Sequence, residues 1–399
     1  MAALAGCSPF STDDELTFYQ AKREVISYFD DLLARFRSAR PQINVQHDIS
    51  SNLSAGFVRH SPPDLGCLNY NFEIARFVEA GALSDLADLP SADRVNPDLL
   101  PLIKLTAYYP GRTSVIPYSL MAASVLYNRD IFDEHGFEVP TTWSEMIDLC
   151  EACKGEGITP IYSTFAEPWT IGQGLFDYSV GGMVDIEAFF TQLRSQGDDV
   201  GPHSPVSFQK NFAEPVGRML KLAAYSNKDA PSRTYGDGNL AFSQGKSAMY
   251  FQGPWALTEI AKTNKDMNIG AFPLPMTDNP ADRKVRVNID LALWIPKMSH
   301  RKDQARELLG YLMQPEVINP YNDFANGFGV TVDAPPTQNP TLADMQPYYD
   351  AAAFYLGASQ LMPQSIPIHN YAQAMVLGSN PESILARMDA DWARLAFRS

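Results

Sequence analysis

Periodic apolar positions at the start of the chain predict a strand, a helix and a second strand. Residues 16–19 are rich in β-forming side chains, and residues 23–37 carry apolar side chains at the spacing of one helix face. Pro41 then interrupts the chain, and residues 43–45 resume a strand pattern. A strand, a helix and a strand in this order predict a βαβ unit, and hence a parallel sheet whose faces are covered.

Apolar runs in the rest of the chain predict further strands over residues 122–127, 160–165, 268–275 and 285–295, and one-face periodicity predicts a helix over residues 303–313. A helix start is marked where Thr142 precedes Glu145 by three residues, because this spacing is that of a capping box. We therefore interpret Trp143, at the first helical position, as a packing anchor rather than a ligand contact.

The stretch from Phe242 to Trp255 (FSQGKSAMYFQGPW) contains a helix end, a short apolar run and a break at Gly253-Pro254. Proline removes a backbone donor, so a strand ends where this pair begins. The next side chain, Trp255, is then expected to present a flat apolar face at the rim of a cleft.

Polar and aromatic side chains follow several of the predicted strands. Asn69, Tyr70 and Asn71 come after a short apolar run, and in α/β sheets ligands bind beyond the carboxyl ends of strands. An asparagine before a helix can equally serve as its N-cap, so both interpretations stay open for Asn69 and Asn71. Similarly placed are a carboxylate beside an aromatic, Glu167 and Trp169, and two polar residues within a β run, Asn288 and Asp290.

Composition and charge limit the class of protein. A chain of 399 residues is too long for one ordinary core, which favours two lobes. It is 45% hydrophobic and 19% charged, and no apolar run is long enough to span a bilayer. The formal net charge of -15 argues against a nucleic-acid partner, which would need a basic patch.

Four cysteines are too few for a disulfide scaffold in a chain of this size. Cys150 and Cys153 form a CxxC pair on a predicted helix, but no second cysteine or histidine pair stands near, so buried thiols are favoured over a zinc or redox site. Cys7 follows Leu4-Ala5-Gly6, which resembles the lipobox of bacterial lipoproteins. Residues 1–15 are accordingly expected to be a leader and the remnant of a lipid anchor.

The sequence shows no catalytic or cofactor motif. The six histidines lack metal-ligand spacing, and no nucleophile elbow or nucleotide-binding glycine loop is present; the turn at residues 326–329 lacks the lysine of a phosphate loop. We predict no cofactor and no metal. Aromatic rings and amides at strand ends suit sugar recognition, because pyranose C–H faces stack on rings while amides and carboxylates bond hydroxyls.

Several blocks taken together resemble the extracellular solute-binding proteins of family 1, the sugar receptors of bacterial ABC importers. The blocks occur in the family's order and cover most of the chain: residues 16–19 with their helix and Pro41-x-Ile43, Pro63-Asp64, residues 125–132, Pro140-x-Thr142-Trp143-x-Glu145, Phe242-x-x-Gly245-Lys246-x-Ala248-Met249, Gly253-Pro254-Trp255 and Gly270-x-x-Pro273-Leu274-Pro275.

The resemblance implies an α/β, two-lobed periplasmic-binding-protein-like fold, with a doubly wound sheet in each lobe and a ligand cleft between them. It would place one lobe at residues 16–116 plus 265–311 and the other at residues 117–264 plus 312–399. The resemblance carries the family's ligand contacts onto Trp255, Trp169, Glu167, Gln20, Lys22, Asn69, Tyr70, Asn71 and Tyr371. We expect these residues to bind ligand, together with Asn288 and Asp290.

Two positions depart from the maltodextrin receptors of the family. Met121 stands where those proteins carry a ligand carboxylate, and Leu68 stands where they carry a stacking tryptophan. Maltodextrin specificity is therefore not expected to carry over to this chain.

The resemblance implies a non-catalytic, monomeric receptor outside the cytoplasmic membrane. It would capture a di- or oligosaccharide and present it to the ABC permease, touching the membrane only through the lipid anchor at Cys7. One alternative is a receptor for a glycerol phosphate or another phosphorylated molecule, which needs a basic cluster where the sequence offers only Lys22. The other is a glycosidase with two carboxylates, whose approach is spatial and leaves no sequence motif.

Overall fold

Strand β1 (Glu15–Tyr19) lies in the first sheet between β2 (Asn44–Asp48) and β3 (Leu65–Leu68), and it pairs with both in parallel. Helix α1 (Ile26–Ala39) connects β1 to β2, and it packs its apolar face on the sheet, with the rings of Phe29 and Phe18 5.6 Å apart. The predicted βαβ opening is confirmed. The computed structural model describes residues 15–395, so the expectations for residues 1–14, Cys7 included, lie outside the described residues.

Strand β9 (Val285–Trp294) completes the first sheet and is buried along its whole length. It runs antiparallel to β3 and to β4 (Ile116–Ala123), and it pairs in parallel with β10 (Phe354–Leu356), which gives six strands. Glycine is required opposite the end of β9, because a Cβ atom on Gly66 would lie 2.0 Å from the ring of Trp294.

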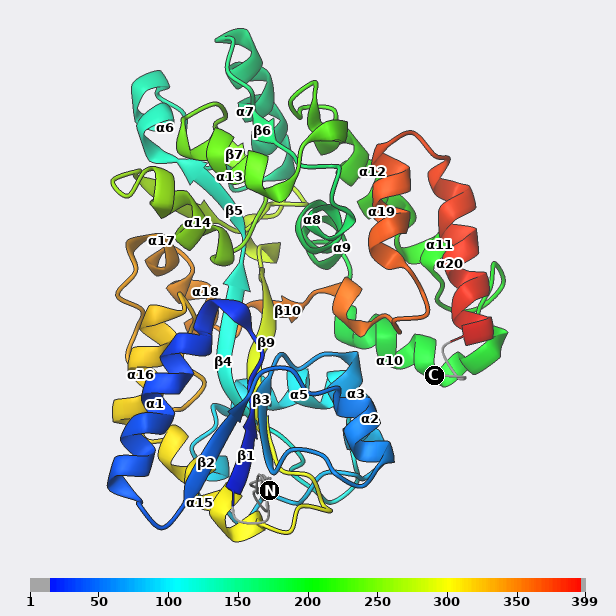
Figure 1. Ribbon diagram of the computed structural model, residues 1–399. Coiled ribbons are helices and arrows are strands. Elements are labelled where there is room, and N and C mark those ends of the chain that lie inside the picture. The colour runs from blue at the N-terminus through cyan, green and yellow to red at the C-terminus, as the bar shows by residue number, and fades with distance from the viewer. Residues whose placement is uncertain (1–14, 396–399) are drawn as a thin grey trace, which may run out of the picture.

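The second sheet is smaller and has β5 (Val125–Asn128) near its centre. Strands β7 (Met249–Tyr250) and β8 (Ile269–Phe272) flank β5 antiparallel, and β6 (Ile161–Tyr162) pairs in parallel with β7. Ser124 alone separates β4 from β5, so the chain passes from one sheet directly into the other. Figure 1 shows the resulting two lobes, with β4 and β9 running between them.

Helices cover both sheets. The first lobe carries α1, α2 (Leu53–Val58), α3 (Phe72–Glu79), α4 (Pro90–Asp93), α5 (Leu100–Thr106), α15 (Lys302–Leu312) and α16 (Pro315–Phe324). The second carries α6 (Arg129–His135), α7 (Trp143–Gly155), α8 (Pro168–Ile171), α9 (Asp177–Gly181), α13 (Tyr235–Ser243) and α14 (Trp255–Thr263), with a π-helical turn over Gly172–Phe176 between α8 and α9. Across residues 15–395, none of these helices is long and apolar enough to cross a membrane.

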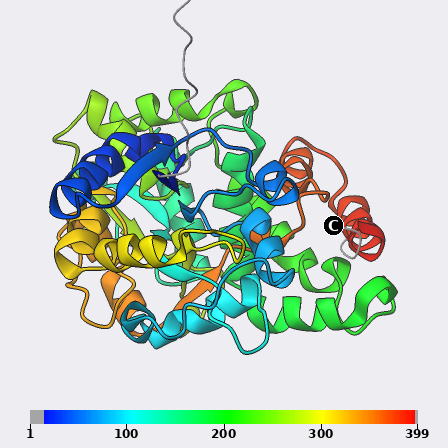
Figure 2. The ribbon, with the colours of Figure 1, turned by 60° about the horizontal axis from the view of Figure 1, so that its bottom comes forward.

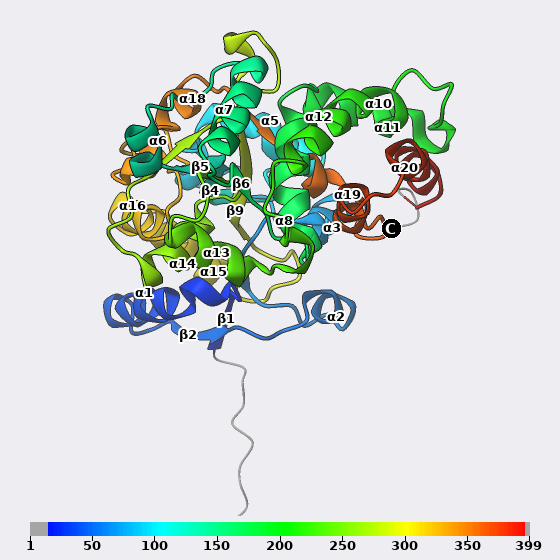
Figure 3. The same ribbon diagram turned by 90° about the horizontal axis from the view of Figure 1, so that it is seen from above.

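A flank of helices extends from one side of the second lobe, as Figures 1 and 3 show. It consists of α10 (Ile186–Gln196), α11 (Phe208–Asn211), α12 (Ala213–Ala223), α19 (Ile368–Val376) and α20 (Pro381–Leu395). In Figure 2 the red helix α20 lies on the opposite side of the molecule from the dark blue α1. The short helices α17 (Pro340–Ala343) and α18 (Gln346–Asp350) connect the lobes.

Sheet membership differs from the predicted division of the chain in three places. Strand β4 lies in the first sheet although residues from 117 onward were assigned to the second lobe, and β8 lies in the second sheet although residues 265–311 were assigned to the first. Helix α16 packs on α1, with the rings of Tyr28 and Phe324 stacked 4.7 Å apart, and not in the second lobe. Long-range pairing of β8 with β5 and of α16 with α1 determines these placements.

Candidate ligand-binding site

An aromatic pair stands on the second lobe at the start of α8 and α13. The rings of Trp169 and Tyr235 lie 5.0 Å apart at an angle of 62°. Glu167 connects them, because its Oε2 accepts a hydrogen bond from Trp169 Nε1 (2.7 Å) and its Oε1 accepts one from the backbone N–H of Tyr235 (2.9 Å). Glu167, predicted to bind ligand, thus has both oxygens engaged in holding the two rings in place.

Tyr235 faces groups from both lobes. Burial raises the pKa of its hydroxyl, and the carboxylates of Glu259, Glu24 and Glu167 raise it further. Glu24 lies in the short 3₁₀ turn Arg23–Val25, which follows β1 in the first lobe. Tyr235 begins α13, whose start carries a capping box of Thr234 and Asp237, and no pattern in the sequence identified Tyr235 as a site residue.

Trp255 is the first residue of α14 and is half-buried. Its Nε1 donates a hydrogen bond to Gln252 Oε1 (3.2 Å), and its ring lies against Gly253, where a Cβ atom would be 2.2 Å away. Glu259 follows one turn later, and side chains four residues apart share a helix face. Helix α14 packs against α13, the helix that Tyr235 begins.

The first lobe contributes polar groups beyond the carboxyl ends of its strands. Lys22 Nζ contacts both carboxylate oxygens of Asp290, at 2.9 and 2.7 Å, and so connects the end of β1 to β9. Gln20 is fully buried, and its side-chain nitrogen and oxygen have no hydrogen-bond partner among residues 15–395. Buried amides are ordinarily bonded, so Gln20 retains donor and acceptor capacity beside this ion pair.

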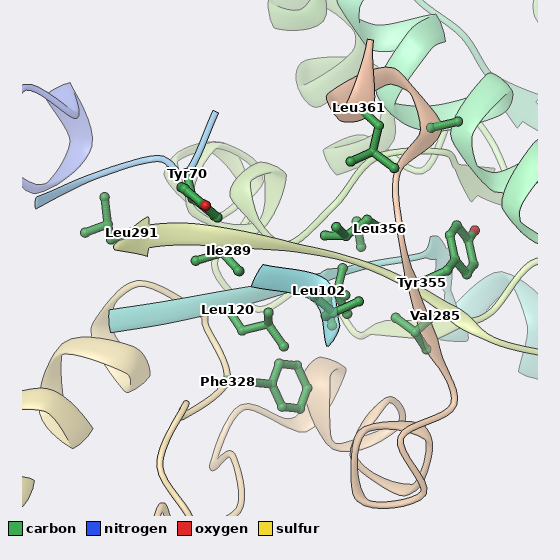
Figure 4. Close-up of a cluster of buried hydrophobic side chains, with 14 of the residues drawn as sticks. Tyr70, Leu102, Leu120, Val285, Ile289, Leu291, Phe328, Tyr355, Leu356 and Leu361 are labelled. Carbon is green, nitrogen blue, oxygen red and sulfur yellow. The ribbon is translucent and has the colours of Figure 1, made fainter. Parts of the chain in front are cut away.

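Alternate residues of β9 form a polar row, Arg286, Asn288 and Asp290, on one face of the strand. Arg286 donates from Nη1 to Asn288 Oδ1 (3.0 Å) and from Nε to Asp177 Oδ2 (3.3 Å), which belongs to α9. The row therefore extends from the second lobe, through the buried middle of the molecule, to Lys22 of the first. The opposite face of β9 is apolar, and Figure 4 shows Val285, Ile289 and Leu291 within the hydrophobic core.

A hollow of about 380 Å³ on the first lobe lies elsewhere. It is lined by Thr17, Gln46, His47, Asp48, Ile49, Ser50, Ser51, Ser61, Pro62 and Pro63. It has no phenylalanine, tyrosine or tryptophan on which a sugar ring could stack. The aromatic and polar groups collected between the lobes remain the better candidate.

Residues 22–318 of the chain match the family described as bacterial extracellular solute-binding proteins. The chain belongs to this family. The resemblance recognised from the sequence blocks is thereby confirmed.

Relatives of this solute-binding protein carry names that refer to sugars. The multiple sugar-binding protein of Streptococcus mutans is 23% identical over 324 residues, which cover 78% of this chain and 74% of the relative. The apo form of RafE from Streptococcus pneumoniae has a TM-score of 0.80 at 20% identity, covering 98% of this chain and 99% of RafE. RafE in complex with raffinose has a TM-score of 0.78 at 20% identity over 95% of this chain and 99% of RafE. These structures confirm the two-lobed α/β fold.

Two aromatic residues predicted to bind ligand in this solute-binding protein are buried and hydrogen-bonded within the protein. Tyr70 is buried in the core that Figure 4 shows, and its hydroxyl donates to the carbonyl of Ala107 (3.4 Å). Tyr371 is buried between α19 and α20, where its hydroxyl donates to Asp391. The sequence pattern marked both as aromatics near loops, but it did not show that tertiary packing covers them.

The two asparagines beside Tyr70 separate in their roles. Asn71 is the N-cap of α3, and its Oδ1 accepts hydrogen bonds from the backbone N–H groups of Glu73 (3.0 Å) and Ile74 (3.2 Å). This is the capping role that the sequence left open. Asn69 is half-buried, and its backbone oxygen accepts from Asn71, so its side chain remains a candidate ligand contact.

Replacing Asn71 by alanine is expected to destabilise the protein by about 1 kcal/mol, because two N–H groups at the start of α3 lose their acceptor. Sugar affinity is expected to stay unchanged. Chemical denaturation and calorimetry measure the two quantities, and Asn69→Ala, which removes no cap, is the matched control for stability alone. A loss of sugar affinity at unchanged stability in Asn71→Ala would show that Asn71 contacts the ligand.

Cys150 and Cys153 are both buried and unpaired on α7. Burial raises the pKa of both thiols, that of Cys153 to about 11. Such thiols stay protonated at neutral pH, which confirms the prediction that they pack into the core. Within the described part of the chain, no group of three or more histidine, cysteine or acidic side chains has the arrangement of a metal site.

Proposed function

We propose that this solute-binding protein captures a carbohydrate between its two lobes and delivers it to an ABC importer. Three observations support this proposal: the aromatic pair Trp169 and Tyr235, the half-buried Trp255 at the start of α14, and the polar groups that follow β1. Pyranose rings stack on such aromatic faces, and their hydroxyls bond to carboxylates, amides and ammonium groups. The sugar-related names of the relatives agree with this proposal.

Binding would work by closure of the lobes around the sugar. A ligand that contacts both lobes stabilises the closed arrangement by its differential affinity for it. The second lobe would supply Trp169, Tyr235 and Trp255 for stacking, while the first would supply Lys22, Asp290, Gln20 and Asn69 for hydrogen bonds. The protein would release the sugar unchanged, since its role is to hold the ligand for transport.

The proposal includes the surroundings of the receptor. It would act outside the cytoplasmic membrane as a monomer, with permease subunits as its protein partner. Cys7 would carry the lipid that keeps the protein at the membrane. Mass spectrometry of the protein expressed in a bacterial host tests the lipid directly.

A thermal-shift screen across neutral mono-, di- and oligosaccharides tests the proposed function. A ligand that binds only the folded state raises the melting temperature, by linkage. We expect at least one di- or oligosaccharide to raise it in a concentration-dependent way, and chromatography to recover that sugar intact. A screen without any shift would contradict the proposed function, and cleavage of the sugar would favour a glycosidase.

Glu167→Ala is expected to weaken sugar binding by about 1–2 kcal/mol, because Trp169 and Tyr235 lose the carboxylate that fixes them. The loss would come from positioning, so the tryptophan fluorescence of the ligand-free protein should change as well. Glu167→Gln, which keeps one acceptor oxygen, is expected to show a smaller effect on both. If affinity fell while the ligand-free fluorescence stayed constant, Glu167 would contact the sugar directly.

A further inference from the structure

The ion pair between Lys22 and Asp290 lies beyond the carboxyl ends of β1 and β3, on the side of the first lobe to which the proposed function assigns the ligand. Asp290 lies on β9 just past the carboxyl end of β3, because Leu68, the last residue of β3, pairs with Ala292. Lys22 reaches it from the end of β1 and contacts both of its oxygens. The side chains are 23% and 8% exposed, so the pair borders solvent on the lysine side.

Acidic residues also follow the ends of the neighbouring strands. Glu24 comes two residues after Lys22, and Asp48 ends β2, which pairs with β1. Of the basic groups nearby, Arg286 is buried and bound to Asp177 and Asn288. Arg23, next to Lys22, is exposed to solvent.

We propose that Asp290 sets the charge selectivity of the ligand site, which admits neutral sugars and rejects phosphorylated ones. This inference rests on the proposed function. An anionic group near Lys22 must compete with a carboxylate that already holds the ammonium in a two-oxygen contact, and it would face that carboxylate at short range. Like charges brought together at an interface are strongly unfavourable when desolvated.

A neutral sugar meets no such conflict. The pair offers both an acceptor, the Asp290 carboxylate, and a donor, the Lys22 ammonium, and a sugar hydroxyl can use either. Gln20 adds an amide with donor and acceptor capacity at the same place. The same residues that exclude an anion therefore suit a polyhydroxylated neutral ligand.

The test compares the neutral sugar found in the thermal-shift screen with its phosphate ester, by calorimetry at low salt. Wild type is expected to prefer the neutral sugar by at least about 100-fold. Asp290→Asn leaves Lys22 uncompensated and keeps an acceptor oxygen, so its affinity for the ester is expected to rise at least about tenfold. Asp333→Asn, which removes one charge from an exposed pair with Arg94, is the matched control and should leave both affinities unchanged.

Each outcome decides the matter. A wild type that binds the ester as tightly as the neutral sugar overturns the inference without any variant. Asp290→Asn that folds, binds the neutral sugar and gains nothing for the ester also overturns it, as does an equal gain in Asp333→Asn. If neither ligand binds wild type while its folding is intact, the proposed function itself fails, which is a distinguishable result.

Discussion

Asp177→Ala is expected to lower the free energy of unfolding by about 3–5 kcal/mol, because it leaves the buried guanidinium of Arg286 without its counter-charge. Both side chains of this pair are fully buried. Asp177 also accepts hydrogen bonds from the backbone N–H and the hydroxyl of Ser359, at 2.8 and 2.7 Å. One carboxylate thus connects α9, β9 and the turn that follows β10.

Urea denaturation followed by circular dichroism measures this change. Asp333→Ala, which breaks the exposed pair with Arg94, is the control and is expected to cost about 1 kcal/mol or less. Combining Asp177→Leu with Arg286→Met should recover most of the stability, since apolar replacement of a whole buried pair is often neutral. A loss below about 1 kcal/mol in Asp177→Ala would contradict the account of this pair.

Trp255→Ala is expected to weaken sugar binding by at least about 1–2 kcal/mol, which is roughly 5- to 30-fold in Kd. The indole is half-buried and fixed by Gln252 and Gly253, so its face is held ready for a sugar ring. Isothermal titration calorimetry measures the loss, with the sugar identified in the screen.

Trp143→Ala is the matched control for Trp255. This indole is also half-buried, but it begins α7 and packs against the guanidinium of Arg218 of α12 at 5.0 Å. It should reduce stability without changing sugar affinity. Unchanged affinity in Trp255→Ala, or an equal loss in Trp143→Ala, would remove Trp255 from the site.

Local patterns predicted the elements of this fold closely, because their signals are short in range. The run at residues 285–295 became β9, the periodic residues after β1 became α1, and Thr142 with Glu145 formed the predicted capping box. The break at Gly253-Pro254 likewise placed Trp255 at an element boundary, where it begins α14.

The sequence could not show how distant segments combine. Tyr235 carried no signal because its importance comes from Trp169 and Glu24, which lie far from it in the sequence. Glu167 was predicted as a ligand contact, but its hydrogen bond to the backbone N–H of Tyr235 depends on tertiary structure. Sheet membership departs from the predicted lobe boundaries for the same reason, since β8 joins the second sheet through a partner more than a hundred residues earlier in the chain.

A crystal structure with the sugar identified in the screen tests the central claim most directly. The account predicts the sugar between the lobes, stacked on Trp255 or the Trp169–Tyr235 pair and hydrogen-bonded to Lys22, Asp290 or Gln20 of the first lobe. A sugar bound to the outer surface of one lobe, with these side chains uninvolved, would contradict it.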